Sequence, residues 1–221
     1  MSEPRGYLDV LRQESRGGPR SYGEFARYLE AKARRTNTPL NGQFELTPLC
    51  NLSCKMCYVR RTEQQMAGRS PLPPAVWKDL MAQAFSAGMF EATLTGGECL
   101  AYPGFEELYL YLQSLGCQIT VMTNAVLLNE DRLRFFEAHP PALIQATLYG
   151  PSEEAYERVT GRRVFHTVRE NLSRARAAGL ALSVSITPNG HLGEDVFETI
   201  RLAHSLSDAA LKKMRDMGVI E

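Results

Sequence analysis

Segments of two lengths alternate along residues 41–206. Short runs of strand length are followed by longer segments whose apolar residues recur at helical spacing. The predicted strands are 41–47, 90–95, 118–123, 142–149 and 180–187. The predicted helices that follow them are 73–87, 103–115, 128–138, 164–178 and 194–204. Regular strand–helix alternation is typical of βαβ units, so the pattern predicts an α/β fold built on a parallel sheet.

Two segments flank the regular core of residues 41–206. Residues 1–40 are polar and rich in Arg and Glu, and they are predicted to form an N-terminal helical extension, which either packs on the core or docks a partner or substrate. Residues 207–221 are predicted to form a C-terminal helical tail. The helices expected in these two segments are 7–13, 22–33 and 208–217.

Composition and charge narrow the class of protein. The 221 residues contain 25 Lys and Arg against 25 Asp and Glu, so no global field favours nucleic acid or an anionic membrane. The N-terminus lacks the apolar core of a signal peptide, and no apolar run approaches ~20 residues. The odd number of cysteines, five, fits a reducing compartment. We therefore expect a cytoplasmic protein without a nucleic-acid or membrane partner.

Three cysteines lie directly after the first predicted strand. Cys50, Cys54 and Cys57 have the spacing C-x3-C-x2-C. Thiolates this close together suit a soft metal or an iron–sulfur cluster. A four-iron cluster held by three thiolates leaves one iron open to a non-protein ligand, as a catalytic zinc keeps an open position. A structural zinc site with a fourth ligand from elsewhere and a set of free thiols are the alternatives.

Other polar or glycine-rich segments also follow strand ends. Gly96-Gly97-Glu98 comes after the second predicted strand, and Asn124 comes after the third. Because the carboxyl ends of parallel strands meet at one end of a barrel, we expect these residues to lie beside the cysteine loop. Cys99 follows Glu98 directly and is a candidate catalytic thiol near the cavity. Cys117 begins a strand and is expected to be buried as a small hydrophobic residue.

Together these motifs resemble the radical S-adenosylmethionine (radical SAM) enzymes. The resemblance covers residues ~41 to 206 and rests on the three cysteines, Thr95-Gly96-Gly97-Glu98 and Thr123-Asn124-Ala125. Leu148-Tyr149-Gly150 and the segment 156–161, Tyr-Glu-Arg-Val-Thr-Gly, look like the peptide- and protein-modifying branch, whose full members carry a SPASM domain. The resemblance implies a partial (βα) barrel that binds one [4Fe–4S] cluster and SAM.

The resemblance also implies roles for individual residues. Cys50, Cys54 and Cys57 would ligate three irons, and the open iron would chelate the methionine half of SAM. Gly96, Gly97 and Glu98 would bind the amino group of SAM. The other implied SAM-binding residues are Met56 and Tyr58 near the adenine, Thr147 and Ser185 towards the ribose and carboxylate, and Asn124 beside the site. From the residues alone, Asn124 could equally make a turn, and Thr147 and Ser185 could be core strand residues.

The implied chemistry is reductive cleavage of SAM to methionine and a 5′-deoxyadenosyl radical, which takes a hydrogen from the substrate. The expected substrate is a peptide or protein side chain, and the expected electron donor is a protein such as a flavodoxin or ferredoxin. The alternatives are a radical SAM enzyme of a small metabolite, a non-catalytic remnant or accessory subunit that binds cluster and SAM, and a zinc-binding structural protein.

The end of the chain departs from the family pattern. The family core usually has one more βα unit than the five strands predicted here. The sixth strand is therefore expected to be missing or reduced to a stub at Val219-Ile220. A SPASM domain needs further cysteines for its auxiliary clusters, and none follows Cys117. The sequence is accordingly expected to be a member shortened at its C-terminus.

Overall fold

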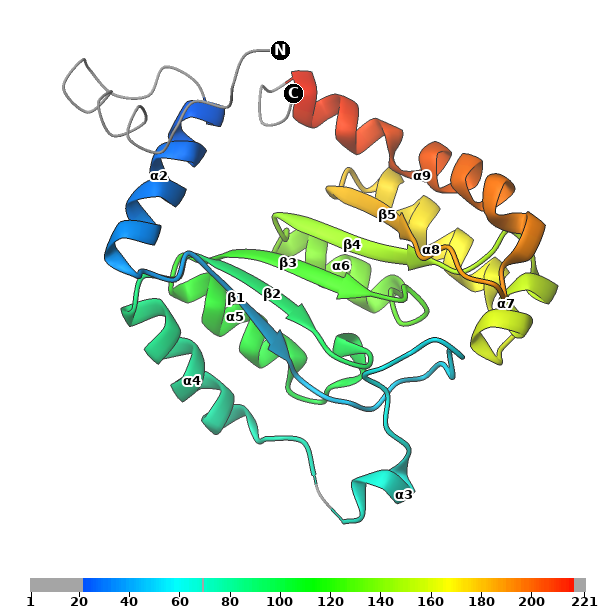
Figure 1. The fold of residues 1–221 in the computed structure, drawn as a ribbon, viewed down its shortest axis with the longest axis horizontal. Helices are drawn as coiled ribbons and strands as arrows, with labels where there is room; N and C mark the ends of the chain where they lie inside the picture. The colour runs from blue at the N-terminus through cyan, green and yellow to red at the C-terminus, as the bar shows by residue number, and fades with distance from the viewer. Residues whose placement is uncertain (1–21, 69, 217–221) are drawn as a thin grey trace.

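The computed structural model describes residues 22–68 and 70–216. Its centre is one sheet of five parallel strands in the order β1-β2-β3-β4-β5, which is also their order in the sequence (Figure 1). The strands are β1 Asn41–Glu45, β2 Glu91–Thr95, β3 Gln118–Thr123, β4 Leu143–Leu148 and β5 Leu182–Ile186. The sheet is curved but not closed, so the predicted α/β fold with five parallel strands in a partial barrel is confirmed.

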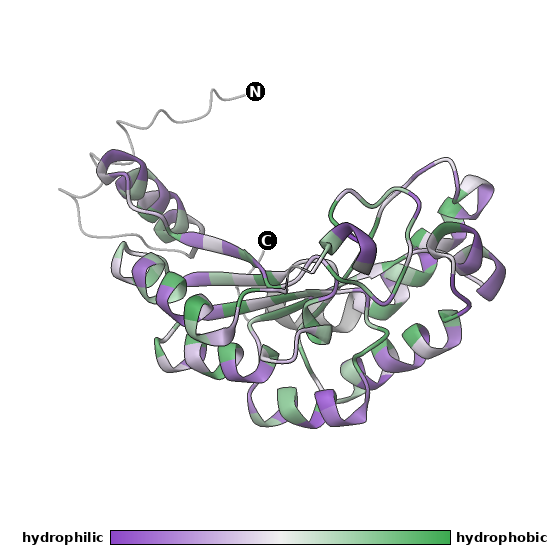
Figure 2. Ribbon diagram, turned by 90° about the horizontal axis from the view of Figure 1, so that it is seen from below, coloured by the Kyte–Doolittle hydropathy of each residue, from purple (hydrophilic) through white to green (hydrophobic). Residues whose placement is uncertain are grey.

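Most of the longer helices follow strands and cover one face of the sheet (Figures 1 and 2). The longer helices are α2 Tyr22–Thr36, α4 Pro74–Ser86, α5 Phe105–Ser114, α6 Glu130–Ala138, α8 Phe165–Ala177 and α9 Val196–Asp216. The short helices are α3 Glu63–Met66, α7 Glu153–Thr160, and the 3-10 turns η2 Cys99–Ala101 and η3 Gly193–Asp195. No described helix is long and apolar enough to cross a membrane.

The two faces of the sheet differ in polarity. Alternate residues of β4, such as Ile144 and Ala146, are completely buried beneath the helices. Their neighbours Gln145 and Thr147 point to the other face and are only half-buried. Because successive strand residues face opposite sides, the concave face of the partial barrel carries the polar side chains. This arrangement leaves a polar interior at the carboxyl end of the strands.

One correction concerns the C-terminal helices. The sequence predicts separate helices at 194–204 and 208–217, but the structure has the single helix α9 from Val196 to Asp216. Ser207 does not break the helix, because its buried hydroxyl donates to the carbonyl of Ala203 at 2.9 Å. The boundary expected between residues 206 and 207 therefore lies inside a continuous helix.

A second correction is α7, which the sequence does not predict as a helix. Its eight residues are mostly polar and give too short a pattern for periodicity. The two signals that mark it are local. The hydroxyl of Ser152 accepts from the amide of Ala155, and Gly161 ends the helix in the left-handed conformation with φ 73°. The predicted helix 7–13 and the predicted strand stub at Val219-Ile220 lie outside the described residues.

Candidate functional site

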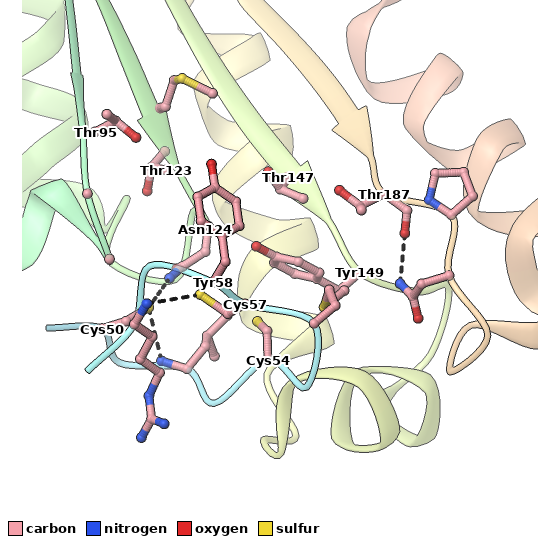
Figure 3. A pocket seen from close by; sticks show the side chains of 18 residues that line it. Cys50, Cys54, Cys57, Tyr58, Thr95, Thr123, Asn124, Thr147, Tyr149 and Thr187 are labelled. Atoms are coloured by element: carbon pink, nitrogen blue, oxygen red, sulfur yellow. Dashed lines mark hydrogen bonds between the residues drawn. The ribbon is translucent and has the colours of Figure 1, made fainter. Parts of the chain in front are cut away.

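A cavity of about 460 Å³ lies at the carboxyl end of the sheet (Figure 3). Its walls come from the cysteine loop and from the residues that end β2, β3, β4 and β5. The predicted site residues that line it are Cys50, Cys54, Cys57, Met56, Tyr58, Gly96, Gly97, Asn124 and Thr147. Glu98 and Cys99 are buried behind its wall, whereas Ser185, which is half-buried on β5 and paired with Thr147, is not among the lining residues. The fold thus brings together motifs that are far apart in the sequence.

The three thiols of the cysteine loop differ in exposure. Cys50 and Cys54 are half-buried, whereas Cys57 is exposed. Burial raises the pKa of Cys50, and burial together with the nearby Cys50 raises the pKa of Cys54 to about 11. A bound metal needs the thiolate form, so binding would expel these protons.

The Cys54 side of the loop rests on the end of α7. The amides on either side of Cys54 donate to that helix: Ser53 N to Thr160 O at 2.9 Å, and Lys55 N to Val159 O at 3.0 Å. Carbonyls in the last turn of a helix have no partner within it, so the loop satisfies two of them. The cysteine loop therefore docks on the segment 156–161, for which the sequence indicated only a family resemblance.

The Cys50 side of the loop runs along the glycine motif. The amide of Gly97 donates to Thr47 O at 2.6 Å, and the amide of Glu98 donates to Leu49 O at 2.9 Å. A Cβ atom on Gly96 would lie 2.4 Å from Thr47 O, and one on Gly97 would lie 2.3 Å from Leu49 O. Gly96 also has φ 139°, which disfavours any side chain. The two glycines therefore let the chain before Cys50 approach β2 closely.

Glu98 is buried, with 1% of its surface exposed. Its carboxylate accepts from Thr123 Oγ1 at 2.8 Å, from Asn124 N at 2.8 Å and from Leu100 N at 3.1 Å, and the Cys99 sulfur lies 4.0 Å from Oε1. Burial raises the pKa of this carboxyl group although these donors oppose the shift. The carboxylate is thus engaged by the chain's own donors behind the cavity wall, and its role at the amino group of SAM stays a prediction.

The predicted residues Cys99 and Ser185, which do not line the cavity, have hydrogen-bond partners of their own. The thiol of Cys99 is buried in the core and donates to Met122 O at 3.2 Å, and its burial raises its pKa well above the usual value. The hydroxyl of Ser185 accepts from Gln145 Nε2 at 3.3 Å. Cys117 is buried at the start of β3, as predicted.

Two of the lining residues that were not predicted as part of the site, Tyr149 and Arg60, carry groups that matter for its chemistry. Tyr149 lies beside Cys54 (Figure 3), and its hydroxyl acts to lower the pKa of that thiol against the larger effect of burial. Its ring packs edge-on against Tyr156 with centroids 6.0 Å apart. Arg60 is the single charged side chain among the described lining residues. Their positions in the sequence could have identified them, because Tyr149 directly follows β4 and Arg60 lies three residues after Cys57.

The donor set fits a cluster held by thiolates. In ranges 22–68 and 70–216, no three His, Cys, Asp or Glu residues are close enough together to hold a single metal ion. Three thiols nevertheless line one cavity, which they share with residues from the carboxyl ends of four strands. Thiolates are the ligands that iron–sulfur clusters take from proteins, and a cavity of this volume has the size of a small-molecule site.

Comparisons with known proteins agree with this chemistry. Residues 44–206 match the model of the radical SAM superfamily. The PqqA peptide cyclase of Xanthomonas euvesicatoria pv. vesicatoria is 28% identical over 166 residues, which cover 75% of this chain and 44% of that protein. A probable GTP 3′,8-cyclase of Aeropyrum pernix is 29% identical over 171 residues, which cover 73% of this chain and 46% of that protein.

A solved structure has the same fold. The crystal structure of Streptococcus suis SuiB bound to S-adenosylmethionine matches with a TM-score of 0.67 at 16% identity, over 90% of this chain and 48% of SuiB. At this identity the likeness concerns the fold alone. The chain spans less than half the length of these relatives.

Proposed function

Because this chain belongs to the radical SAM superfamily, we propose that Cys50, Cys54 and Cys57 hold a [4Fe–4S] cluster and that the cavity beside them binds SAM. The observation that carries the proposal is that the three thiols line one cavity together with Gly96, Gly97 and Asn124. When bound, these cofactors supply a 5′-deoxyadenosyl radical by one-electron cleavage of SAM.

The chain's own residues bind and orient the cofactors in this proposal. Met56 and Tyr58 line the cavity and offer surfaces for the adenine. Thr147 lines the wall from β4 and offers a hydroxyl to the ribose. Tyr149 lies beside Cys54, and a hydrogen bond from its hydroxyl to the bound sulfur would tune the reduction potential of the cluster. Arg60 supplies the one positive charge of the lining and suits the carboxylate of SAM.

We propose a peptide or protein side chain as the substrate. The support is the likeness to a peptide cyclase across three quarters of this chain. The similar identity to a probable GTP cyclase favours a small metabolite as the second candidate. In either case the chain works in the cytoplasm and receives its electron from a reduced protein such as a flavodoxin or ferredoxin.

The deciding experiment is anaerobic reconstitution with iron and sulfide, followed by reduction with dithionite in the presence of SAM. We expect about four irons per chain and formation of 5′-deoxyadenosine. Cluster assembly without 5′-deoxyadenosine would favour a non-catalytic accessory subunit. Tight zinc binding with no iron-dependent absorbance would contradict the proposal and favour the structural zinc protein.

A pair of cysteine variants tests the ligand assignment. Cys54→Ala removes a proposed ligand, so iron content and the cluster absorbance should fall to background. Cys117→Ala changes a buried thiol directly before β3, at the end of the strand away from the cavity, and should leave the cluster intact. If Cys117→Ala also removed the cluster, the ligand assignment would be wrong.

A further inference from the structure

The buried carboxylate of Glu98 connects two motifs through the end of β3. One oxygen accepts from the hydroxyl of Thr123, and the other accepts from the backbone amide of Asn124. The pairing of Leu94 with Val121 brings the end of β3 level with the glycine motif. The last residue of that motif therefore fixes the turn in which Asn124 lies.

The side chain of Asn124 continues the connection to the cysteine loop (Figure 3). Its amide nitrogen lies 2.7 Å from Asn51 Oδ1 and 3.6 Å from Cys50 Sγ, and it donates to both. Its amide oxygen accepts from Val126 N at 3.0 Å, which fixes the orientation of the amide group. Asn124 is itself 5% exposed. The contact with Cys50 spans 74 residues of sequence.

We infer that Glu98 and Asn124 are positioning residues for Cys50: Glu98 holds the backbone of Asn124, and the Asn124 amide orients the Cys50 sulfur towards the cluster. The inference rests on the proposed function, because it takes Cys50 as a cluster ligand. It assigns Glu98 to the cluster loop, through Asn124, and not to direct contact with SAM. The carboxylate is suited to this role because its donors, Leu100 N, Thr123 Oγ1 and Asn124 N, all lie within the wall.

The expected consequence is that both residues act on the cluster before SAM binds. Each oxygen of Glu98 accepts from a backbone amide, Leu100 N at one oxygen and Asn124 N at the other, and a backbone amide can only donate. In Glu98→Gln, the new NH2 group therefore faces one of these N–H donors. In Asn124→Ala, Asn51 and Cys50 lose a donor. Changes to residues that orient a metal ligand typically weaken metal binding by about 10- to 100-fold.

One isosteric variant separates positioning from packing. Asn124→Asp keeps the volume of the side chain but replaces the donor with an oxygen that repels Asn51 Oδ1 and the Cys50 sulfur. A packing role predicts that Asn124→Asp behaves like the wild type, whereas positioning predicts that it is at least as impaired as Asn124→Ala. The matched control is Asn129→Ala, which removes the cap of α6 at Arg132 N, outside the cavity.

The measurements are made without SAM on the reconstituted full chain. They are the rate of cluster loss to a chelator and the electron paramagnetic resonance spectrum of the reduced cluster. We expect about tenfold faster loss and an altered spectrum in Glu98→Gln, Asn124→Ala and Asn124→Asp, with Asn129→Ala unchanged. Thermal melting of each iron-free variant shows whether it folds. If Glu98→Gln does not fold, Asn124→Asp alone tests the positioning inference.

The outcomes are distinguishable from failure of the proposed function. If the wild-type chain assembles no cluster, the proposed function fails first. If the wild type assembles a cluster, and Glu98→Gln and Asn124→Asp match its SAM-free stability and spectrum, the positioning inference is overturned. SAM affinity is measured separately on the reconstituted variants, and its loss in Glu98→Gln with cluster retention and spectrum unchanged would return that carboxylate to a direct contact with SAM.

Discussion

The Cys54 and Cys50 sides of the cysteine loop are held by two different kinds of contact. Around Cys54, two loop amides donate to backbone carbonyls at the end of α7. Around Cys50, the loop depends on the absence of side chains at Gly96 and Gly97 and on the amide of Asn124. The first contact is made by backbone and tolerates many side chains. The second depends on residue identity at each position.

Cys57 has neither the α7 carbonyls that support Cys54 nor the glycine motif and Asn124 that support Cys50. It is exposed, and its hydrogen bonds stay within the loop: its amide donates to Cys54 O at 3.1 Å, and its sulfur accepts from Arg60 N at 3.2 Å. Cys57 therefore depends on Cys54 for its place. The comparison teaches that one ligand is held by main chain, one by side chains, and the third by its neighbours.

The largest effect is expected when the backbone support at Cys54 is broken. Lys55→Pro removes the amide that donates to Val159 O, and it restricts the conformation of Cys54. We expect most of the cluster to be lost, as measured by iron per chain after reconstitution. Lys55→Ala keeps the amide and should retain the cluster. Equal losses in the two variants would show that the Lys55 side chain, not its amide, holds the loop.

The glycine support on the Cys50 side is expected to be the next most sensitive. Gly97→Ala forces a Cβ atom against Leu49 O, so we expect the free energy of unfolding to fall by about 2–4 kcal/mol. Urea unfolding of the iron-free protein measures this change. Gly190→Ala is the control, because its Cβ meets nothing within 4 Å. A neutral Gly97→Ala would mean that the loop can move away from β2.

A smaller effect is expected inside α7. The buried hydroxyl of Thr160 donates to Tyr156 O at 2.7 Å, and Thr160→Val should cost about 1 kcal/mol of unfolding free energy. Thr199→Val removes a similar buried hydroxyl bond, to Asp195 O, at the start of α9. Both variants should lose similar stability, while faster chelation of the cluster should appear in Thr160→Val alone. Faster chelation in both variants would show that cluster retention does not depend specifically on the contact between α7 and the cysteine loop.

The smallest effect is expected on the outer side of α7. Arg158 forms an ion pair with Asp195, and the two side chains are 46% and 35% exposed. An ion pair this accessible to water contributes at most about 1 kcal/mol, and salt weakens it. Arg158→Ala should therefore lower the melting temperature slightly and leave cluster retention unchanged. A marked loss of cluster would show that the α7 contact depends on side chains after all.

Much of the fold and part of the site followed from local sequence. The five strands are all where the pattern predicted them, within two residues at each end, because each was marked by its own length and by a helical segment after it. The spacing of Cys50, Cys54 and Cys57 predicted a shared site, because neighbouring thiols on one loop cannot be far apart. The burial of Cys117 followed in the same way, from its place at the start of a strand.

Tertiary structure decided what the side chains around the loop do. The sequence placed Glu98 beside the cavity, but its direction depends on donors supplied by β3, which only the sheet register brings near. Asn124 contacts Cys50, and α7 receives the loop, through contacts between residues far apart in the chain. Spacing therefore fixes which groups share an edge of the sheet. The direction in which each group points depends on partners that packing alone provides.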